Sequence, residues 1–356
     1  MARPPRGFTA HDTPEVVQRI ASDLGRALLE VRQADPGLRA LVLTGGFARG
    51  EGAVLRGAPV NDYDLLALRG LAPPRNRYPA VRASLEEALG LHLDLQPVWA
   101  GRLGFARPSV FWYETALRGH TLWGDAGLLA RIPVRTHEQL DAREGLRLLA
   151  NRAAGLLLGA RASAHDRRLQ AAKALLAALD ANLLAGGAFA PSQRERWELW
   201  RRLREAGEGP ARLEPWEPSL RWAIAFKLDP AAASGRDPDE AWRAGAHALL
   251  DAVQPALRAA RMRSLEAYAR ADDLVENLPF RLRSRAVPGA RPWALHPTGR
   301  VRAAGLLLLA ERVERAREFE AGGRGARSVL ARVVRGLPQD PELVPVLERL
   351  RGVTLP

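Results

Sequence analysis

The sequence predicts an α+β protein, in which an N-terminal α/β head with a mixed sheet precedes an all-helical C-terminal domain. The first 135 residues alternate between helical periodicity and short apolar runs that are typical of strands. After about residue 137 the strand patterns nearly disappear. A chain of 356 residues is also long enough for about two domains. We therefore predict one domain over residues 1–135 and a helical domain over residues 136–356.

Capping and periodicity locate the elements of the head. Thr13 followed by Pro14 is typical of a helix start, and Asp35-Pro36-Gly37 interrupts the helical periodicity that follows. Later strands are indicated by apolar runs and by alternation of apolar and polar residues. We expect helices over 13–34, 78–89 and 109–120, strands over 38–44, 63–68 and 91–99, and a short extended segment over 121–124.

The remainder of the chain carries helical patterns separated by glycine and proline breaks. We expect helical segments over 137–160, 166–185, 191–206, 238–271, 299–320 and 324–336.

Composition excludes several classes of protein. The hydrophobic fraction of 47% and the charged fraction of 26% are ordinary for a soluble globular protein. No apolar run approaches the roughly 18 residues that a membrane span requires. The N-terminus lacks the apolar core of a signal peptide, so we expect a cytoplasmic protein with no membrane partner. With no cysteine, a metal would have to bind oxygen or imidazole ligands.

The net charge of +13 raises the question of a nucleic-acid surface. Nearly all of the positive charge is arginine, and the only lysines are Lys173 and Lys227. An excess of Arg, Ala, Gly, Leu and Pro is what GC-rich coding produces. Arginines also stand at helical i,i+4 spacing from acidic residues, as Arg315 does from Glu311. We interpret the charge as coding bias that also attracts a polyanionic nucleotide, rather than as a dedicated nucleic-acid surface.

One stretch combines the residue types of a phosphate and metal site. The predicted strand over 38–44 runs into Gly45-Gly46, where backbone N–H groups approach a charged ligand without interference from a Cβ atom. Asp62 and Asp64 flank one residue on the next strand, so their side chains point to the same face. Two converging carboxylates repel each other unless a cation lies between them, and oxygen ligands favour Mg²⁺. Asp94 is the polar exception on the third strand and joins the pair if the strands are adjacent.

These residues resemble the DNA polymerase β-like nucleotidyltransferase superfamily, and most closely its branch that modifies small molecules such as aminoglycosides. The shared pattern is a strand, a Gly-Gly or Gly-Ser pair, Asp-x-Asp on the next strand and a third carboxylate on a later one. Gly45-Gly46, Asp62-Tyr63-Asp64 and Asp94 match it over roughly residues 38–99. The resemblance implies that two Mg²⁺ ions bind the three aspartates and hold a nucleoside triphosphate such as ATP, while an acceptor hydroxyl attacks the α-phosphate.

The resemblance also implies individual roles. Gly45 and Gly46 would contact the β- and γ-phosphates, and Asp94 would bind the catalytic metal or take the acceptor proton. Many members of the superfamily have serine at the position of Gly46, so phosphate contact here would rest on backbone donors, with Arg49 as a compensating charge. Lys173 is a further candidate phosphate ligand, because an arginine-rich chain that keeps a lysine within a helix has a use for a compact, flexible charge. Glu51 is expected to be an ion-pairing or helix-terminal residue.

Three functional hypotheses remain open at this point. The first is transfer of a nucleoside monophosphate to a hydroxyl on a small molecule, with the helical domain closing over the acceptor. The second keeps this chemistry and makes RNA or a protein the acceptor. The third is a catalytically silent relative that only binds nucleotide, which the presence of all three carboxylates disfavours. The sequence does not indicate the oligomeric state.

Overall fold

The structure is a computed structural model that describes residues 7–70, 77–270 and 297–315. It contains two compact units. Unit 1 comprises residues 1–141, 189–199 and 224–234, and unit 2 comprises residues 142–188, 200–223 and 235–356. The mixed α+β class is confirmed, because unit 1 holds a mixed sheet and the later part of the chain is helical. The domain boundary at 135/136 stays a prediction.

A four-stranded sheet with the order β5-β4-β1-β6 organises unit 1. Its strands are β1 (Leu38–Thr44), β4 (Tyr63–Arg69), β5 (Leu93–Trp99) and β6 (His120–Gly124). β1 runs antiparallel to both β4 and β6, whereas β4 and β5 are parallel. The predicted strands are therefore present, the third beginning two residues later than expected.

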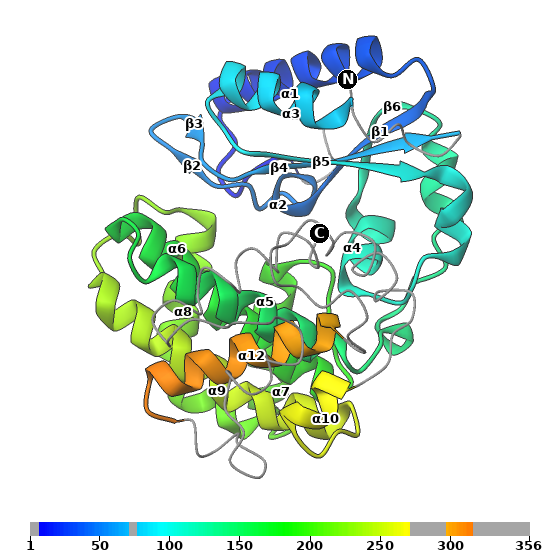
Figure 1. Cartoon of the computed structure of the whole chain (residues 1–356). Helices are drawn as coiled ribbons and strands as arrows, with labels where there is room; N and C mark the ends of the chain where they lie inside the picture. The colour runs from blue at the N-terminus through cyan, green and yellow to red at the C-terminus, as the bar shows by residue number, and fades with distance from the viewer. Residues whose placement is uncertain (1–6, 71–76, 271–296, 316–356) are drawn as a thin grey trace, which may run out of the picture. The chain divides into compact units, whose positions relative to one another are not determined.

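Alternation along the strands gives the sheet two buried faces. Leu41 and Leu43 of β1 belong to the core under α1 (Pro14–Ala34) and α3 (Tyr78–Leu89), which lie on one side of the sheet in Figure 1. Ala40 and Val42 face the other core, with residues of the 3₁₀ segments η1 (Ala100–Phe105) and η2 (Ala126–Arg131) and of α4 (Val110–Arg118). This period of two is the ordinary consequence of strand geometry.

Local signals explain the helix starts that the sequence predicted. Thr13 caps α1, its Oγ1 accepting a hydrogen bond from the Val16 N–H at 3.3 Å, with Pro14 at the first helical position. Ser109 caps α4 in the same way, accepting from the Trp112 N–H at 3.3 Å. Both helices were expected from these residues.

Some short elements were not expected. The one-turn helix α2 (Gly45–Ala48) follows β1, and a small hairpin joins β2 (Val54–Leu55) to β3 (Ala58–Pro59). The hairpin turn has Arg56 at φ 52° and Gly57 at φ 79°. A left-handed arginine is uncommon at such a turn, so the sequence signal for it was weak.

Unit 2 is built around α6 (Ala164–Ala185), which packs against α5 (Glu144–Gly159) and α9 (Pro238–Ala259). α12 (Pro297–Arg312) packs against α5 and α10 (Leu265–Arg270). Two helices have residues in both units: α7 (Gln193–Glu205) and α8 (Glu217–Leu228). Short 3₁₀ segments η3 (His137–Gln139) and η4 (Ala211–Trp216) precede α5 and α8.

The predicted helical segments agree with these elements except in some bounds. The segment predicted over 137–160 becomes helical only at Glu144, apart from η3. The segment predicted over 238–271 is two helices, α9 and α10, with a break between them. The α8 helix was not predicted. The segment expected over 299–320 is described as far as residue 315, and the one expected over 324–336 lies outside the described residues. None of the helices in the described ranges has the length and apolar character of a membrane span.

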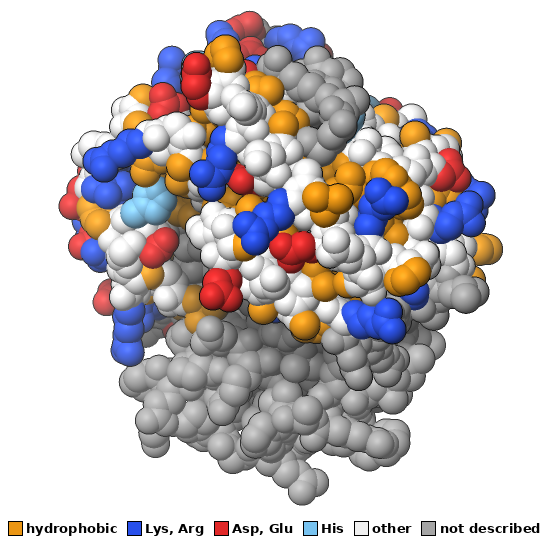
Figure 2. Space-filling view, turned by 90° about the horizontal axis from the view of Figure 1, so that it is seen from above, with side chains coloured by type: hydrophobic (Ala, Val, Ile, Leu, Met, Phe, Trp, Pro, Cys, Tyr) orange, Lys and Arg blue, Asp and Glu red, His pale blue; other side chains and the backbone are white. Residues whose placement is uncertain are grey.

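Charge is dispersed on the α1 and α3 side of unit 1. Figure 2 shows basic side chains interspersed with acidic and apolar ones on this face. Arg19 pairs with Asp23 at 3.0 Å and Arg26 with Glu30 at 3.2 Å, both at i,i+4 spacing on α1. The pair between Arg26 and Glu30 is an exposed helix pair, whereas the Asp23 partner of Arg19 is buried.

Candidate functional site

The end of β1 and the start of β4 place the candidate residues at one edge of the sheet. Because the two strands are antiparallel, Thr44 lies opposite Asp64, and its Oγ1 donates to the Asp64 carbonyl oxygen at 3.2 Å. Gly45 and Gly46 come directly after β1, and Asp62 comes directly before β4. The glycine pair and the first two aspartates therefore lie together, as the motif predicted.

Tyr63 sets which way the neighbouring aspartates face. Its buried ring packs against Phe47 with a centroid distance of 4.7 Å, and its hydroxyl donates to Asp23 Oδ2 at 3.0 Å. Burial, and then the Asp23 carboxylate, raise the pKa of the Tyr63 hydroxyl above its usual range. Since side chains alternate along a strand, anchoring Tyr63 in the core under α1 turns Asp64 to the opposite face of the sheet.

Parallel pairing of β4 with β5 brings in the third carboxylate. Asp64 and Asp94 are direct partners in the register, so they stand side by side on the same face. Gln96, two residues further along β5, donates from Nε2 to Asp94 Oδ2 at 3.0 Å and fixes the carboxylate on that face. The structure thus brings Asp62, Asp64 and Asp94 together.

Electrostatics show that these carboxylates interact. Burial, followed by the charges of Asp62 and Asp94, raises the pKa of Asp64 to about 6. The positive charges of Arg49 and Lys227 act in the opposite direction. A carboxylate whose ionised form is disfavoured by its own neighbours is a position where a bound cation is strongly stabilising.

Gly45 is required by the position of Asp64. Gly45 has a φ of +64°, and a Cβ atom at this residue would lie 1.7 Å from Asp64 Oδ2. Only glycine combines that backbone conformation with such a close carboxylate. The helix that begins here, α2, has only four residues, so a helix dipole contributes little to this site.

Lys227 is a functional candidate that the sequence interpretation did not select. A Cβ atom built on Gly46 would lie 3.3 Å from Lys227 Nζ, so the ammonium group stands directly over the second glycine. The Lys227 charge partly offsets the rise in the pKa of Asp64, and it is one of the causes that lower the pKa of Glu51. Lys227 comes from the part of α8 that belongs to unit 1. The scarcity of lysine in this chain was the signal that could have identified it, but that signal was applied to Lys173 alone.

Arg49 is enclosed by acidic partners. Its Nε donates to Glu51 Oε2 at 3.1 Å and its Nη1 to Glu114 Oε2 at 2.6 Å, and only 10% of its side chain is exposed. Burial opposes the charged form, but the Glu114 and Glu51 carboxylates outweigh it and raise the pKa of Arg49. The positive charge of Arg49 therefore interacts favourably with the Asp64 carboxylate. A direct contact of Arg49 with phosphate stays a prediction.

Two later residues complete this buried network. Arg196 of α7 forms an ion pair with the other Glu114 oxygen, Oε1, and its Nε donates to the Ala190 carbonyl oxygen at 2.7 Å. The Arg194 N–H donates to Glu51 Oε1 at 2.8 Å. Although burial disfavours its charge, Glu51 has a lowered pKa because Arg49, this backbone N–H and Lys227 stabilise the carboxylate. The expectation of an ion-pairing Glu51 is confirmed.

Lys173 has a different setting from Lys227. It lies half-buried on α6, within unit 2, whereas the aspartates and glycines lie in unit 1. Its role as a phosphate ligand stays a prediction.

The donor set of the site fits Mg²⁺. Asp62, Asp64 and Asp94 supply oxygen ligands, and burial, followed by the charges of Asp62 and Asp94, raises the pKa of Asp64, so a divalent cation beside this carboxylate would favour its ionised form. Within residues 7–70, 77–270 and 297–315, no three His, Cys, Asp or Glu side chains are close enough to form a complete metal centre. Mg²⁺ characteristically binds one or two carboxylates and takes its other ligands from substrate phosphate and water.

Comparisons with known proteins give no relative on which to assign a function. No known protein family matches the chain, and no curated protein matches it.

Proposed function

We propose that the chain is a Mg²⁺-dependent nucleotidyltransferase, which moves a nucleoside monophosphate from a nucleoside triphosphate to an acceptor hydroxyl. The observation that carries the proposal is the arrangement around Asp64. Its carboxylate lies beside Asp62 and Asp94, against the backbone of Gly45, with the Lys227 charge close by. Negative charge for a cation and positive charge for a phosphate chain thus occur in one small site.

Phosphate recognition is assigned to the glycine pair and Lys227. Gly45 and Gly46 leave room for phosphate oxygens to reach the backbone, as the resemblance to nucleotidyltransferases implies. Lys227 stands over Gly46 and supplies a compact charge with three donors for the β- and γ-phosphates. This charge replaces the serine hydroxyl that many members of the superfamily have at the second glycine.

The aspartates are assigned to metal binding and proton transfer. Asp62, Asp64 and Asp94 would hold two Mg²⁺ ions, which when bound neutralise the triphosphate and stabilise the attacking and leaving oxygens. Asp94, positioned by Gln96, takes the proton of the acceptor hydroxyl as the new bond between the hydroxyl oxygen and the α-phosphorus forms. The bond from the α-phosphorus to the bridging oxygen breaks, and pyrophosphate leaves.

The buried ion pairs behind the site are assigned a positioning role. Glu51 contacts Arg49 and the backbone of Arg194, and the Lys227 charge is a further cause of its lowered pKa. These contacts connect the loop after Gly46 to the two later segments of unit 1. Preorganised charges of this kind cost no rearrangement when the triphosphate binds.

A small-molecule acceptor is favoured over a macromolecule. The motif formed by Gly45-Gly46, Asp62, Asp64 and Asp94 resembles most closely the branch of the superfamily that modifies small molecules. We also propose a cytoplasmic location, where nucleoside triphosphates are available.

The acceptor class is testable by following a label. The purified full chain is incubated with nucleoside triphosphates labelled at the α-phosphate, Mg²⁺ and cell extract that has been separated into small-molecule, RNA and protein fractions. We expect label to enter a small molecule and to require Asp64, so that Asp64→Asn gives none. Label in RNA or protein would replace the small-molecule acceptor with a macromolecular one. Binding of triphosphate with no transfer in any fraction would indicate the silent relative.

A further inference from the structure

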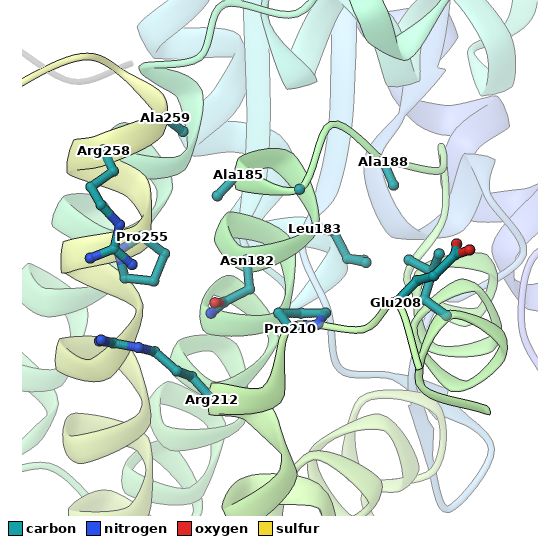
Figure 3. Close-up of a pocket in the computed structure, with 12 residues that line it drawn as sticks. Asn182, Leu183, Ala185, Ala188, Glu208, Pro210, Arg212, Pro255, Arg258 and Ala259 are labelled. Atoms are coloured by element: carbon teal, nitrogen blue, oxygen red, sulfur yellow. The ribbon is translucent and has the colours of Figure 1, made fainter. Parts of the chain in front are cut away.

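Unit 2 contains a cavity that is lined by none of the residues assigned above. It has a volume of about 550 Å³ and lies between α6, α9 and the segment that runs from α7 into η4 (Figure 3). All of its lining residues belong to unit 2. Volumes of about 300 to 1,000 Å³ are typical of small-molecule sites.

Two guanidinium groups and one amide give the cavity its polar side. Figure 3 shows Arg258 of α9, Arg212 of η4 and Asn182 of α6 on the side between α6 and α9, with the Glu208 carboxylate across the cavity from them. Asn182 is buried and is held by a hydrogen bond from its Nδ2 to the Ala178 carbonyl oxygen at 2.8 Å. Its side chain is therefore a fixed wall of the cavity rather than a mobile surface group.

The two arginines differ from several others among the described residues of unit 2, which are ion-paired. Arg236 pairs with Glu240 at 3.0 Å, and Arg204 pairs with Glu217. Within the part of the chain that the structure describes, neither Arg212 nor Arg258 has an ion-pair partner. Two guanidinium groups that border one cavity offer charge-assisted hydrogen-bond donors to an anion.

Helix ends at the cavity do not cancel this charge. Helix C-termini carry partial negative charge, and α6 and α9 both end here. The last α6 carbonyls already accept hydrogen bonds, because the Gly186 N–H donates to the Asn182 oxygen and the Ala188 N–H to the Leu183 oxygen, both at 3.0 Å. The α9 end is closed in the same way by the Ala260 N–H, which donates to the Ala256 oxygen at 3.0 Å. Several of the carbonyl groups at these helix ends are therefore already engaged by backbone N–H groups.

The remaining walls are apolar. They are formed by the side chains of Leu183, Ala185, Ala188, Leu203, Pro210 and Pro255. Such walls accommodate a hydrocarbon or aromatic body, and they favour its burial by about 25 cal/mol for each Å² removed from water.

We propose that this cavity binds a small organic anion, whose carboxylate or phosphate group pairs with Arg212 and Arg258 and whose apolar body fills the space beside Leu183 and Pro210. The site is additional to the proposed nucleotide site and does not depend on it. A ligand bound here would stabilise the packing of α6 against α9 by mass action.

Calorimetric titration of the full chain tests this proposal with three probes of similar size. Benzoate carries a carboxylate, phenyl phosphate carries a phosphate, and benzyl alcohol has the same aromatic body without charge. We expect at least one anion to bind about tenfold or more tightly than benzyl alcohol, because charge-assisted hydrogen bonds contribute more than neutral ones. The preferred anion identifies the head group.

Matched variants locate the binding. The double variant Arg212→Gln, Arg258→Gln is expected to weaken anion binding about tenfold or more, while Arg243→Gln, an exposed arginine on α9 away from the cavity, leaves it unchanged. Ala185→Phe keeps both arginines but fills the cavity, and should abolish binding of the aromatic anions. The proposal is overturned if benzyl alcohol binds as well as the anions, if the arginine variant binds normally, or if the wild type binds neither anion at millimolar concentration.

Discussion

Replacing Gly45 with alanine tests the geometry of the site at its tightest point. The new Cβ atom would lie 1.7 Å from Asp64 Oδ2, at a residue whose φ is +64°. Left-handed backbone costs alanine about 1 to 2 kcal/mol relative to glycine. The overlap adds to this, because the Asp64 carboxylate or the Gly45 backbone has to move before an ordinary van der Waals distance is restored.

The expected loss of activity follows from that displacement. Moving a catalytic group by about 1 Å reduces rates about 100-fold. We therefore expect Gly45→Ala to lower kcat/KM for nucleotidyl transfer by about 100-fold, and to lower the free energy of unfolding by more than the 1 to 2 kcal/mol, roughly, that the backbone conformation alone costs. Steady-state pyrophosphate release and urea titration measure the two quantities.

The adjacent glycine supplies the control. A Cβ atom on Gly46 would lie 3.3 Å from Lys227 Nζ, the mobile end of a long side chain, and Gly46 does not have a positive φ. Gly46→Ala should therefore change kcat/KM by no more than about tenfold, because Lys227 can shift. The reasoning is refuted if Gly45→Ala retains wild-type activity, or if the two variants lose activity equally.

Three further variants probe other parts of the structure. Asp64→Asn should abolish transfer and yet raise the melting temperature at pH 7 without Mg²⁺, because the raised pKa of Asp64 means that its ionised form destabilises the fold. This destabilisation develops as the pH rises from 3.8 towards about 6. The rise in melting temperature caused by Asp64→Asn should therefore vanish at acid pH. An equal rise at all pH values would contradict this explanation. Lys227→Gln should raise KM for the triphosphate and lower kcat/KM by about 10- to 100-fold. Lys173→Gln should lower kcat/KM less. A larger loss of kcat/KM in Lys173→Gln would instead assign the phosphate contact to Lys173. Asp35 has a lowered pKa, since its hydrogen bonds with Arg69 and Tyr78 outweigh the effect of burial. The ionised Asp35 carboxylate therefore stabilises the fold above its ordinary pKa, and this stabilisation is lost as the pH falls through its folded-state pKa. The difference in the free energy of unfolding between wild type and Asp35→Asn, measured by urea titration, should therefore shrink in acid. A difference that is the same at all pH values would contradict a charged contact.

Local signals predicted most of the fold of unit 1. The Thr13-Pro14 cap located α1, and apolar runs located β1 and β4, because each signal concerns residues close together in the chain. Elements with weak local signals were missed. The β2–β3 hairpin turns at a left-handed Arg56, and two-residue strands show no alternation. The α8 helix has Pro218 in its first turn, which is a typical helix-start signal in the sequence.

The candidate site shows the same division between local and distant information. Gly45 and Asp64 belong to one motif, and their closeness follows from the antiparallel pairing of neighbouring strands. Asp94 depended on an assumed strand order that the register confirms. Lys227 and Arg196 could not be placed from the sequence, because their partners lie far away in the chain. Arg196 pairs with Glu114, 82 residues earlier, and Lys227 lies beside Gly46, so no local pattern encodes these contacts.

The destination of each phosphate tests the central claim most directly. The wild-type chain is incubated with Mg²⁺, the small-molecule fraction of the extract, and ATP labelled at either the α- or the γ-phosphate. Nucleotidyl transfer predicts that the α-label enters the acceptor and that the γ-label appears in pyrophosphate. Label from the γ-phosphate on the acceptor would instead indicate phosphoryl transfer, and its release as orthophosphate would indicate hydrolysis. Either result would contradict the role assigned to Asp62, Asp64 and Asp94.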